Sequence, residues 1–105
     1  MRVIAVSTLR KFWEKHSNSE EPLKAWYDEV IHSEWTNSNE LKTTYKSASI
    51  INSKRVVFNI KGNDYRLVVD IEYRLKIIFI VWVGTHGEYD KIDVKAIDYV
   101  KTNKK

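Results

Sequence analysis

The apolar positions in the first third of the chain predict a short strand followed by two helices. The opening MRVIAV is rich in β-branched residues, as is typical of a short edge strand. In STLRKFWEKH (residues 7–16), apolar residues recur at helical spacing behind Ser7, which can cap the first turn. A second amphipathic pattern fills residues 22–31, beyond a polar connector. The polar segment 36–47 predicts one additional helical turn.

The spacing of apolar residues changes from helical to alternating at Arg55, which predicts strands. RVVFNI (residues 55–60) and YRLVVDIEY (residues 65–73) flank the turn KGND, and we expect them to form a hairpin. In the second of these strands, large hydrophobic residues occupy one face, and charged residues, including Arg66, occupy the other. KIIFIVWV (residues 76–83) is apolar on both faces, which predicts the central strand of a sheet that is covered on both sides.

The order of these elements predicts an α+β fold with N-terminal helices packed on an antiparallel β-sheet. The length of 105 residues, of which 43% are hydrophobic and 30% charged, is that of one domain spanning residues 1–105. The chain has no cysteine and shows no secretory signal, so we expect a protein of the reducing cytoplasm. No apolar run approaches membrane-spanning length, so we expect no membrane partner.

Positive charge is concentrated in the strand-rich half of the chain. The formal net charge is +4, and residues 1–52 carry equal numbers of acidic and basic side chains, so the whole excess belongs to residues 53–105. This distribution suits a polyanionic partner such as RNA. A well-solvated surface would have the same composition.

A group of proton-active side chains directly follows the predicted central strand. In the stretch GTHGEYDK, Thr85 and Glu88 have the spacing of a capping box, which predicts a short helix there. On that helix, His86, Tyr89 and Asp90 would share one face. The group suits acid–base chemistry, but a capped helix with one surface histidine is more often ordinary structure.

Other classes of catalytic site lack their motifs. The three histidines, His16, His32 and His86, do not have the spacing of a zinc site. The three glycines are isolated and do not form a phosphate-binding loop. We therefore expect no metal and no cofactor.

Two stretches, RVVFNIKGNDYRLVVDI and IIFIVWVGTHGEYDKID, resemble the HigB family of toxins from bacterial toxin–antitoxin pairs. Upstream, PLKAWYDEV and ELKTTYKSASI match the helical half of that family, so the resemblance covers nearly the whole chain. Two positions depart from the family pattern: Gly87 stands where alanine is usual, and Trp82 where phenylalanine or a smaller side chain is usual. We expect Gly87 to loosen the first helical turn and Trp82 to alter packing near the site, but neither removes a reactive group.

The resemblance implies the RelE-like fold and a metal-independent endoribonuclease, an mRNA interferase that cuts translated messenger RNA on the ribosome. In such an enzyme the ribose 2′-hydroxyl attacks the adjacent phosphate. The site must remove a proton, neutralise developing charge and protonate the leaving 5′-oxygen. The implied partners are messenger RNA, the ribosome and a cognate HigA-like helix-turn-helix antitoxin that silences the toxin.

Four residues are candidates for the catalytic roles that this resemblance implies. His86 is the candidate general base or acid, Tyr89 a second proton donor or a stacking group, and Asp90 can orient the imidazole. Arg66 can offer a planar guanidinium to the scissile phosphate. Alternatively, Arg66 pairs with an acidic residue of its own strand, and Tyr89 belongs to the core.

The candidate RNA-binding residues surround the hairpin and the short helix. Tyr65 and Tyr73 could stack on bases, but alternation places them on the face opposite Arg66, so at least some of these aromatics belong to the core. A non-enzymatic module of the same fold, which binds RNA, the ribosome or a partner protein, is the alternative function. The candidate RNA-binding residues are Lys54, Arg55, Asn59, Lys61, Arg74 and Lys91.

Overall fold

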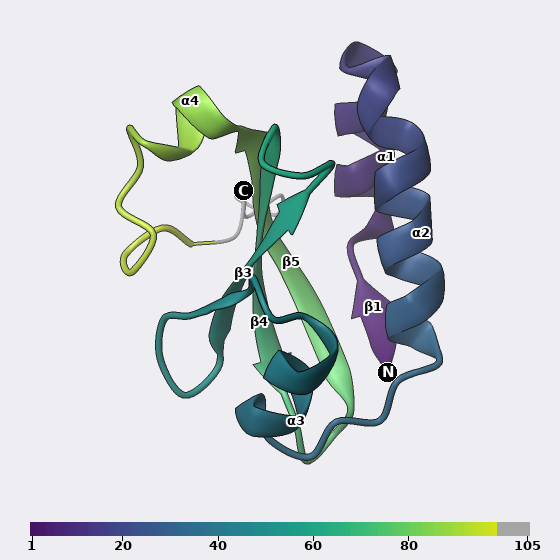
Figure 1. Cartoon of the computed structure of the whole chain (residues 1–105), viewed down its shortest axis with the longest axis vertical. Coiled ribbons are helices and arrows are strands. Elements are labelled where there is room, and N and C mark those ends of the chain that lie inside the picture. Colours follow the sequence, from purple (N-terminus) through teal and green to yellow (C-terminus); the bar gives the residue numbers. More distant parts are fainter. Residues whose placement is uncertain (99–105) are drawn as a thin grey trace, which may run out of the picture.

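The computed structural model describes residues 1–98 and has an α+β architecture (Figure 1). Helices dominate the first half of the chain, and strands dominate the second. In chain order the elements are β1 (Arg2–Ile4), α1 (Val6–Lys15), the 3₁₀ turn η1 (Ser17–Ser19), α2 (Glu20–Ile31), α3 (Ser38–Thr44), β2 (Ser49–Ile50), β3 (Arg55–Ile60), β4 (Tyr65–Glu72), β5 (Ile77–Thr85) and α4 (His86–Tyr89).

The five strands form one sheet in the order β1-β5-β4-β3-β2. β2 to β5 pair with antiparallel neighbours, whereas β1 pairs with β5 in parallel, so the sheet is mixed. The predicted α+β fold is confirmed, as is the edge position of the opening strand, but the sheet predicted as antiparallel has one parallel pairing. The apolar strand β5 lies inside the sheet between β1 and β4, but β4 occupies the middle, so the prediction that the apolar strand is the central one was wrong.

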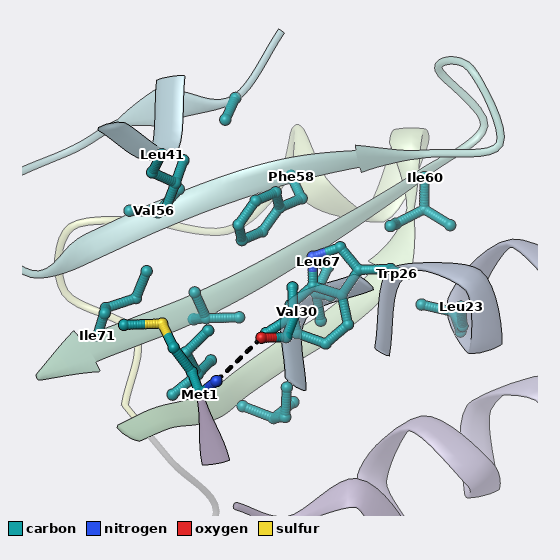
Figure 2. Packing of buried hydrophobic residues seen from close by; sticks show 14 of the residues in the cluster. Met1, Leu23, Trp26, Val30, Leu41, Val56, Phe58, Ile60, Leu67 and Ile71 are labelled. Carbon is teal, nitrogen blue, oxygen red and sulfur yellow. Dashed lines mark hydrogen bonds between the residues drawn. The ribbon is translucent and has the colours of Figure 1, made fainter. Parts of the chain in front are cut away.

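The two faces of the sheet are covered by different parts of the chain. The helices α1 and α2 lie over one face, and α4 with the segment after it lies on the opposite side (Figure 1). The main core fills the space between the first face and the helices, where Leu23, Trp26 and Val30 of α2 pack near Phe58 and Leu67 (Figure 2). This packing follows from the apolar stripe of α2 and the apolar face of the hairpin.

The end of α2 is held by the amino group of Met1. This ammonium donates to the carbonyl oxygens of Val30 (3.1 Å), Ile31 (3.1 Å) and Ser33 (2.7 Å). Figure 2 shows the bond to Val30 within the core. A positive charge is favourable at a helix C-terminus because the last carbonyl groups there lack partners within the helix.

A smaller cluster covers part of the second face. It consists of buried Val57, Val68 and Val81, with partly buried Trp82 and Tyr89 packed against them. Val94 and Ile97, from the segment after α4, also pack against this cluster. The second face is therefore sealed where that segment crosses it.

A bulge in β5 sets which residues face the candidate site. The partners of Val68 and Val69 in β5 are Trp82 and Ile80, so Val81 is the extra residue. Ile80 packs toward the helices before the bulge, and Val83 does so after it. Before the bulge, the even-numbered residues of β5 face the helices. Beyond it, the odd-numbered residues do, so Trp82 and Gly84 lie on the second face of the sheet.

The structure differs from the sequence prediction at the start of α1. The helix begins at Val6, and its N-cap is Ala5, which has a φ of 78° and makes no side-chain cap bond. Ser7 thus lies inside the helix, and the prediction that it caps the helix was wrong. A chain that leaves β1 must turn sharply to enter α1, and this left-handed residue makes the turn. Among residues 1–98, no helix is long and apolar enough to cross a membrane.

Candidate active site

The candidate site is built at the end of the sheet where β4 begins and β5 ends. Arg66 of β4 pairs in register with Asn59 of β3 on one side and Gly84 of β5 on the other. Residues paired across strands project from the same face of a sheet, so these three form a row on the second face. Arg66 and Asn59 are half-buried. Only one further row, Ile60–Tyr65–Thr85, lies beyond theirs, so theirs is the last row that projects from the second face.

The helix α4 starts directly beyond this row and begins with the predicted capping box. The Thr85 hydroxyl accepts from the Glu88 amide (3.1 Å), and the Glu88 carboxylate accepts from the Thr85 amide (2.9 Å). The amide of His86 donates to the carbonyl oxygen of Asp64 in the β3–β4 turn (2.9 Å). The capping box thus fixes the first turn of α4, and the main-chain bond to Asp64 fixes the start of the helix relative to the hairpin.

The structure brings together all four predicted catalytic residues. His86 Nε2 lies 3.5 Å from Asp90 Oδ2 across one turn of helix, and both side chains are exposed. Tyr89 lies one turn from His86 on the same helix, and the Arg66 guanidinium carbon lies 5.5 Å from the centre of its ring. A guanidinium at this distance is attracted to the face of the aromatic ring.

Arg66 keeps most of its hydrogen-bonding capacity for a ligand. Among residues 1–98 its guanidinium donates to one acceptor, the carbonyl oxygen of Asn63 (3.1 Å). The guanidinium carries five N–H groups in a planar fork, so several stay available for a phosphate. Asp70, a possible partner in its own strand, is bound by Arg55 instead.

Trp82 and Gly84 shape the floor beside Arg66. The Trp82 ring lies over Gly84 so closely that a Cβ at position 84 would come within 2.4 Å of the indole. The indole is also 6.3 Å from the Tyr89 ring, between ring centres. Gly84 is not among the residues that sequence analysis selected, because an isolated glycine at a strand end is usually a turn residue. Its pairing opposite Arg66 becomes visible only with the strand register.

Arg55 does not belong to this site, because the fold uses it elsewhere. Its residue is 7% exposed, and its Nε and Nη2 donate to the two oxygens of Asp70 at 2.7 and 2.8 Å. Its Nη1 donates to the carbonyl oxygens of Val94 (3.2 Å) and Ile97. A guanidinium that is buried and engaged in this way cannot contact RNA, so Arg55 is removed from the RNA-binding set.

The other predicted RNA-binding residues are spread over the molecule. Asn59 lies in the Arg66 row, and Lys61 lies in the adjacent turn, paired with Asp64 at 3.2 Å. Lys54 precedes β3 and Arg74 follows β4, so both lie at the opposite end of the sheet from Arg66. Lys91 is exposed and lies two residues beyond the end of α4.

Tyr65 and Tyr73 are core residues, as their alternation opposite Arg66 indicated. Tyr65 is buried beneath α1, its ring 5.5 Å from that of Phe12 in an edge-to-face arrangement, and its hydroxyl bonds to Asn18. Tyr73 packs against the main core, and burial raises the pKa of its hydroxyl. Neither ring is available to stack on RNA.

The immediate surroundings of His86 are open. A hollow of about 500 Å³ lies beside the imidazole and is lined by Asn63 and Asp64 of the turn and by Tyr65, Thr85 and Gly87. Within residues 1–98, no group of three or more His, Cys, Asp or Glu side chains gathers in a way that could hold a metal ion. The chemistry that this arrangement can perform is proton transfer by His86, on a short helix whose Tyr89 ring also carries a guanidinium that can bind an anion.

Comparison with known proteins identifies the family of the chain. The model of the family described as "HigB_toxin, RelE-like toxic component of a toxin-antitoxin system" matches residues 19–92. That range includes α2, the hairpin, β5 and α4, and thus every predicted catalytic residue. No curated protein matches the chain. The resemblance seen in the sequence is confirmed, and the chain belongs to the HigB family of RelE-like toxins, the toxic components of toxin–antitoxin systems.

Proposed function

We propose that this toxin is a metal-independent endoribonuclease that cuts translated messenger RNA on the ribosome and thereby inhibits translation. The proposal starts from membership of the RelE-like toxins, which implies an antitoxin partner. The observation that carries it is the placement of the Arg66 guanidinium over the Tyr89 ring, next to the His86–Asp90 pair. These groups match the three tasks of RNA cleavage by an internal hydroxyl.

Each residue has a distinct role in the proposed reaction. His86 takes the proton from the ribose 2′-hydroxyl, or delivers one to the leaving oxygen, while Asp90 orients its imidazole. The 2′-oxygen then forms a bond to phosphorus as the bond to the 5′-oxygen breaks. Arg66 neutralises the charge that develops on the phosphate oxygens, and Tyr89 supplies a second proton or positions the guanidinium. The products are a 2′,3′-cyclic phosphate and a free 5′-hydroxyl.

The openness of the site is consistent with a substrate that another molecule presents. Both His86 and Asp90 side chains are exposed, at 46% and 63%, so the protein alone excludes little water from the reacting groups. Presentation of messenger RNA by the ribosome would supply the missing enclosure and fix the strand. The proposed working compartment is therefore the cytoplasm, with a HigA-like helix-turn-helix antitoxin as the silencing partner.

The test is messenger RNA cleavage in a reconstituted translation reaction that contains a chelator. Mg²⁺ is kept in excess of the chelator because the ribosome needs it. Wild type, His86→Ala and Arg66→Ala are compared, and Arg10→Ala on the outer surface of α1 serves as the matched arginine control. We expect cutting by wild type and the control, and strong loss in the other two. Thermal unfolding verifies that each variant is folded.

Two outcomes would overturn the proposal. Cutting by His86→Ala and Arg66→Ala at the wild-type rate would place the chemistry elsewhere. A folded wild type that binds ribosomes or RNA but cuts no message would favour the non-enzymatic binding module.

A further inference from the structure

A groove runs beside the candidate active site, along the edge of β5 next to the end of α1. Its volume is about 520 Å³, within the range of roughly 300–1,000 Å³ that is typical of small-ligand sites. It is formed by segments far apart in the sequence. The residues that matter here are Phe12, Lys15 and His16 at the end of α1, Trp82 and Val83 of β5, and Lys91 after α4.

The groove lies where the edge of β5 loses its neighbour. β1 pairs with Ile77, Ile78 and Phe79 of β5, and within residues 1–98 no strand pairs with the later part of β5 on that side. Beyond β1 the end of α1 and the start of α4 stand on either side of the strand. The floor of the groove therefore includes Trp82, two residues from Gly84 in the Arg66 row.

Aromatic rings line both sides of the groove. On the α1 side, the rings of Phe12 and His16 are stacked, with 4.4 Å between ring centres and an angle of 25° between planes. On the β5 side, the groove is lined by the half-buried ring of Trp82. Bases of single-stranded RNA stack on such rings, largely without regard to sequence.

The charges in the groove favour an anion. Lys15 and Lys91 are exposed, and neither forms an ion pair with another residue in the part of the chain that the structure describes. The acidic side chain in the groove is that of Glu88, and its carboxylate already accepts the Thr85 amide in the capping box. Two free ammonium groups flanking aromatic surfaces match a phosphate–base–phosphate unit.

The groove is continuous with the candidate active site through two side chains. Trp82 lies in contact distance of Tyr89, the ring that supports Arg66, and Lys91 follows Tyr89 by two residues. A strand whose scissile phosphate is bound by Arg66 would thus reach the groove with an adjacent nucleotide.

We propose that this groove binds one unpaired nucleotide next to the cleaved phosphate, with its base stacked on Trp82 and its flanking phosphates bound by Lys15 and Lys91. This inference rests on the proposed function, since it names a further subsite for the same RNA. It assigns RNA-binding roles to Lys15 and Trp82, which sequence analysis did not select. Lys15 is 51 residues upstream of Arg66 in the chain, so only the fold reveals that it is near the site.

The experiment measures binding of a short single-stranded RNA whose riboses are 2′-O-methylated. This RNA cannot be cut by 2′-hydroxyl attack, so its affinity does not depend on catalysis. Fluorescence anisotropy compares the full-length wild type with Lys15→Glu/Lys91→Glu and with Lys46→Glu/Lys95→Glu, a control that makes the same charge change at two exposed lysines outside the groove.

We expect the groove variant to bind at least tenfold more weakly than the control variant. A plot of log affinity against log salt concentration should also have a slope that is smaller in magnitude by about 1.4. Each phosphate contact on a single strand contributes about 0.7 to this slope, and the variant loses two such contacts. Trp82→Phe keeps the charge and a smaller ring, so it should weaken binding several-fold with no change in the salt dependence. Thermal unfolding verifies that all variants are folded.

The outcomes separate this inference from the proposed function. Equal affinity of the groove and control variants overturns the groove assignment, whether or not the wild type cuts messenger RNA. Unchanged RNA binding with loss of antitoxin binding also overturns it and assigns the groove to the antitoxin. If the groove variant loses RNA affinity but the wild type cuts no message in translation, the groove is supported as an RNA-binding site and the proposal of a ribonuclease is overturned.

Discussion

Arg55 and Arg66 project from the same face of the sheet, yet the molecule uses them in opposite ways. Arg55 is 7% exposed, and both oxygens of Asp70 accept from its guanidinium. Arg66 is half-buried, and it donates to the carbonyl oxygen of Asn63 and lies over an aromatic ring. The first arginine stabilises the fold, and the second is available to a ligand.

The difference arises from what covers each end of the face. The segment after α4 crosses the sheet at Arg55, where the carbonyl groups of Val94 and Ile97 accept from Nη1. Arg66 lies near the end of the strands, next to α4. The described part of the segment after α4 does not cover it. Whether an arginine stabilises the fold or binds a ligand is decided by the segment of this chain that packs over it. The residue type and the strand that carries the arginine matter less.

The largest effect is expected at the sealed end. Arg55→Ala should lower the free energy of unfolding by about 3–5 kcal/mol, because it leaves the carboxylate of Asp70 buried without its main partner. Urea unfolding measures this loss. Arg55→Met/Asp70→Leu removes both charges and should recover most of it. A loss of less than about 1 kcal/mol in Arg55→Ala would show that the pair is not a structural anchor.

The open end should behave in the reverse way. Arg66→Ala should reduce the rate of RNA cleavage by roughly 10²- to 10³-fold, as is usual when one preorganised donor to a developing charge is removed. Its free energy of unfolding should change by less than about 1 kcal/mol. Arg66→Lys should restore only part of the rate, since an ammonium lacks the planar fork. If Arg66→Ala unfolds as easily as Arg55→Ala, the contrast between the two ends is wrong.

A smaller effect tests the floor beside Arg66. Gly84→Ala should destabilise the protein by about 1–3 kcal/mol, because the new Cβ would lie 2.4 Å from one indole carbon of Trp82 and 2.5 Å from another. Both carbons belong to the six-membered ring of the indole. A phenylalanine side chain is shorter and does not reach as far as these two carbons. Gly84→Ala/Trp82→Phe should therefore be more stable than Gly84→Ala alone in a double-mutant cycle. An additive result would show that the cost comes from another contact, such as Glu88 Oε1, which would lie 2.8 Å from the new Cβ.

The smallest effect concerns a polar group that is sealed without a partner. The Tyr73 hydroxyl is buried and forms no hydrogen bond within residues 1–98, and burial raises its pKa. Tyr73→Phe should change the free energy of unfolding by less than about 1 kcal/mol near neutral pH. A raised pKa contributes stability below the unfolded value of about 10, and this contribution is lost as the pH rises above it. The wild type should thus lose more stability than Tyr73→Phe at alkaline pH, as thermal unfolding across pH 8–11 would measure.

Elements encoded by local pattern could be predicted from the sequence. The alternation in RVVFNI corresponds to the bounds of β3, and the spacing of Thr85 and Glu88 correctly indicated the capping box of α4. Both depend on residues that are close in the chain. The facing of His86, Tyr89 and Asp90 followed from helical geometry for the same reason.

Features that depend on distant contacts could not be predicted. The parallel pairing of β1 with β5 joins residues about 75 positions apart, and nothing local in either strand specifies its direction. The bulge at Val81 leaves no sign in the sequence. The residues around it are apolar on both faces of the strand, so there is no alternation of apolar and polar residues for the bulge to interrupt. The separate roles of Arg55 and Arg66 depend on the path of the segment after α4. Basic residues around a hairpin look alike until that path is known.

The hydrogen bond from the His86 amide to the Asp64 carbonyl has a consequence for how this toxin can diverge. The bond joins main-chain atoms, so it constrains the length of the β3–β4 turn more than the identity of its side chains. The turn includes Lys61 and Gly62, both with positive φ (54° and 63°), which sets its shape. Homologous sequences should therefore vary in composition at Asn63 and Asp64 but resist insertions and deletions there. A change of one residue in that turn would displace the histidine.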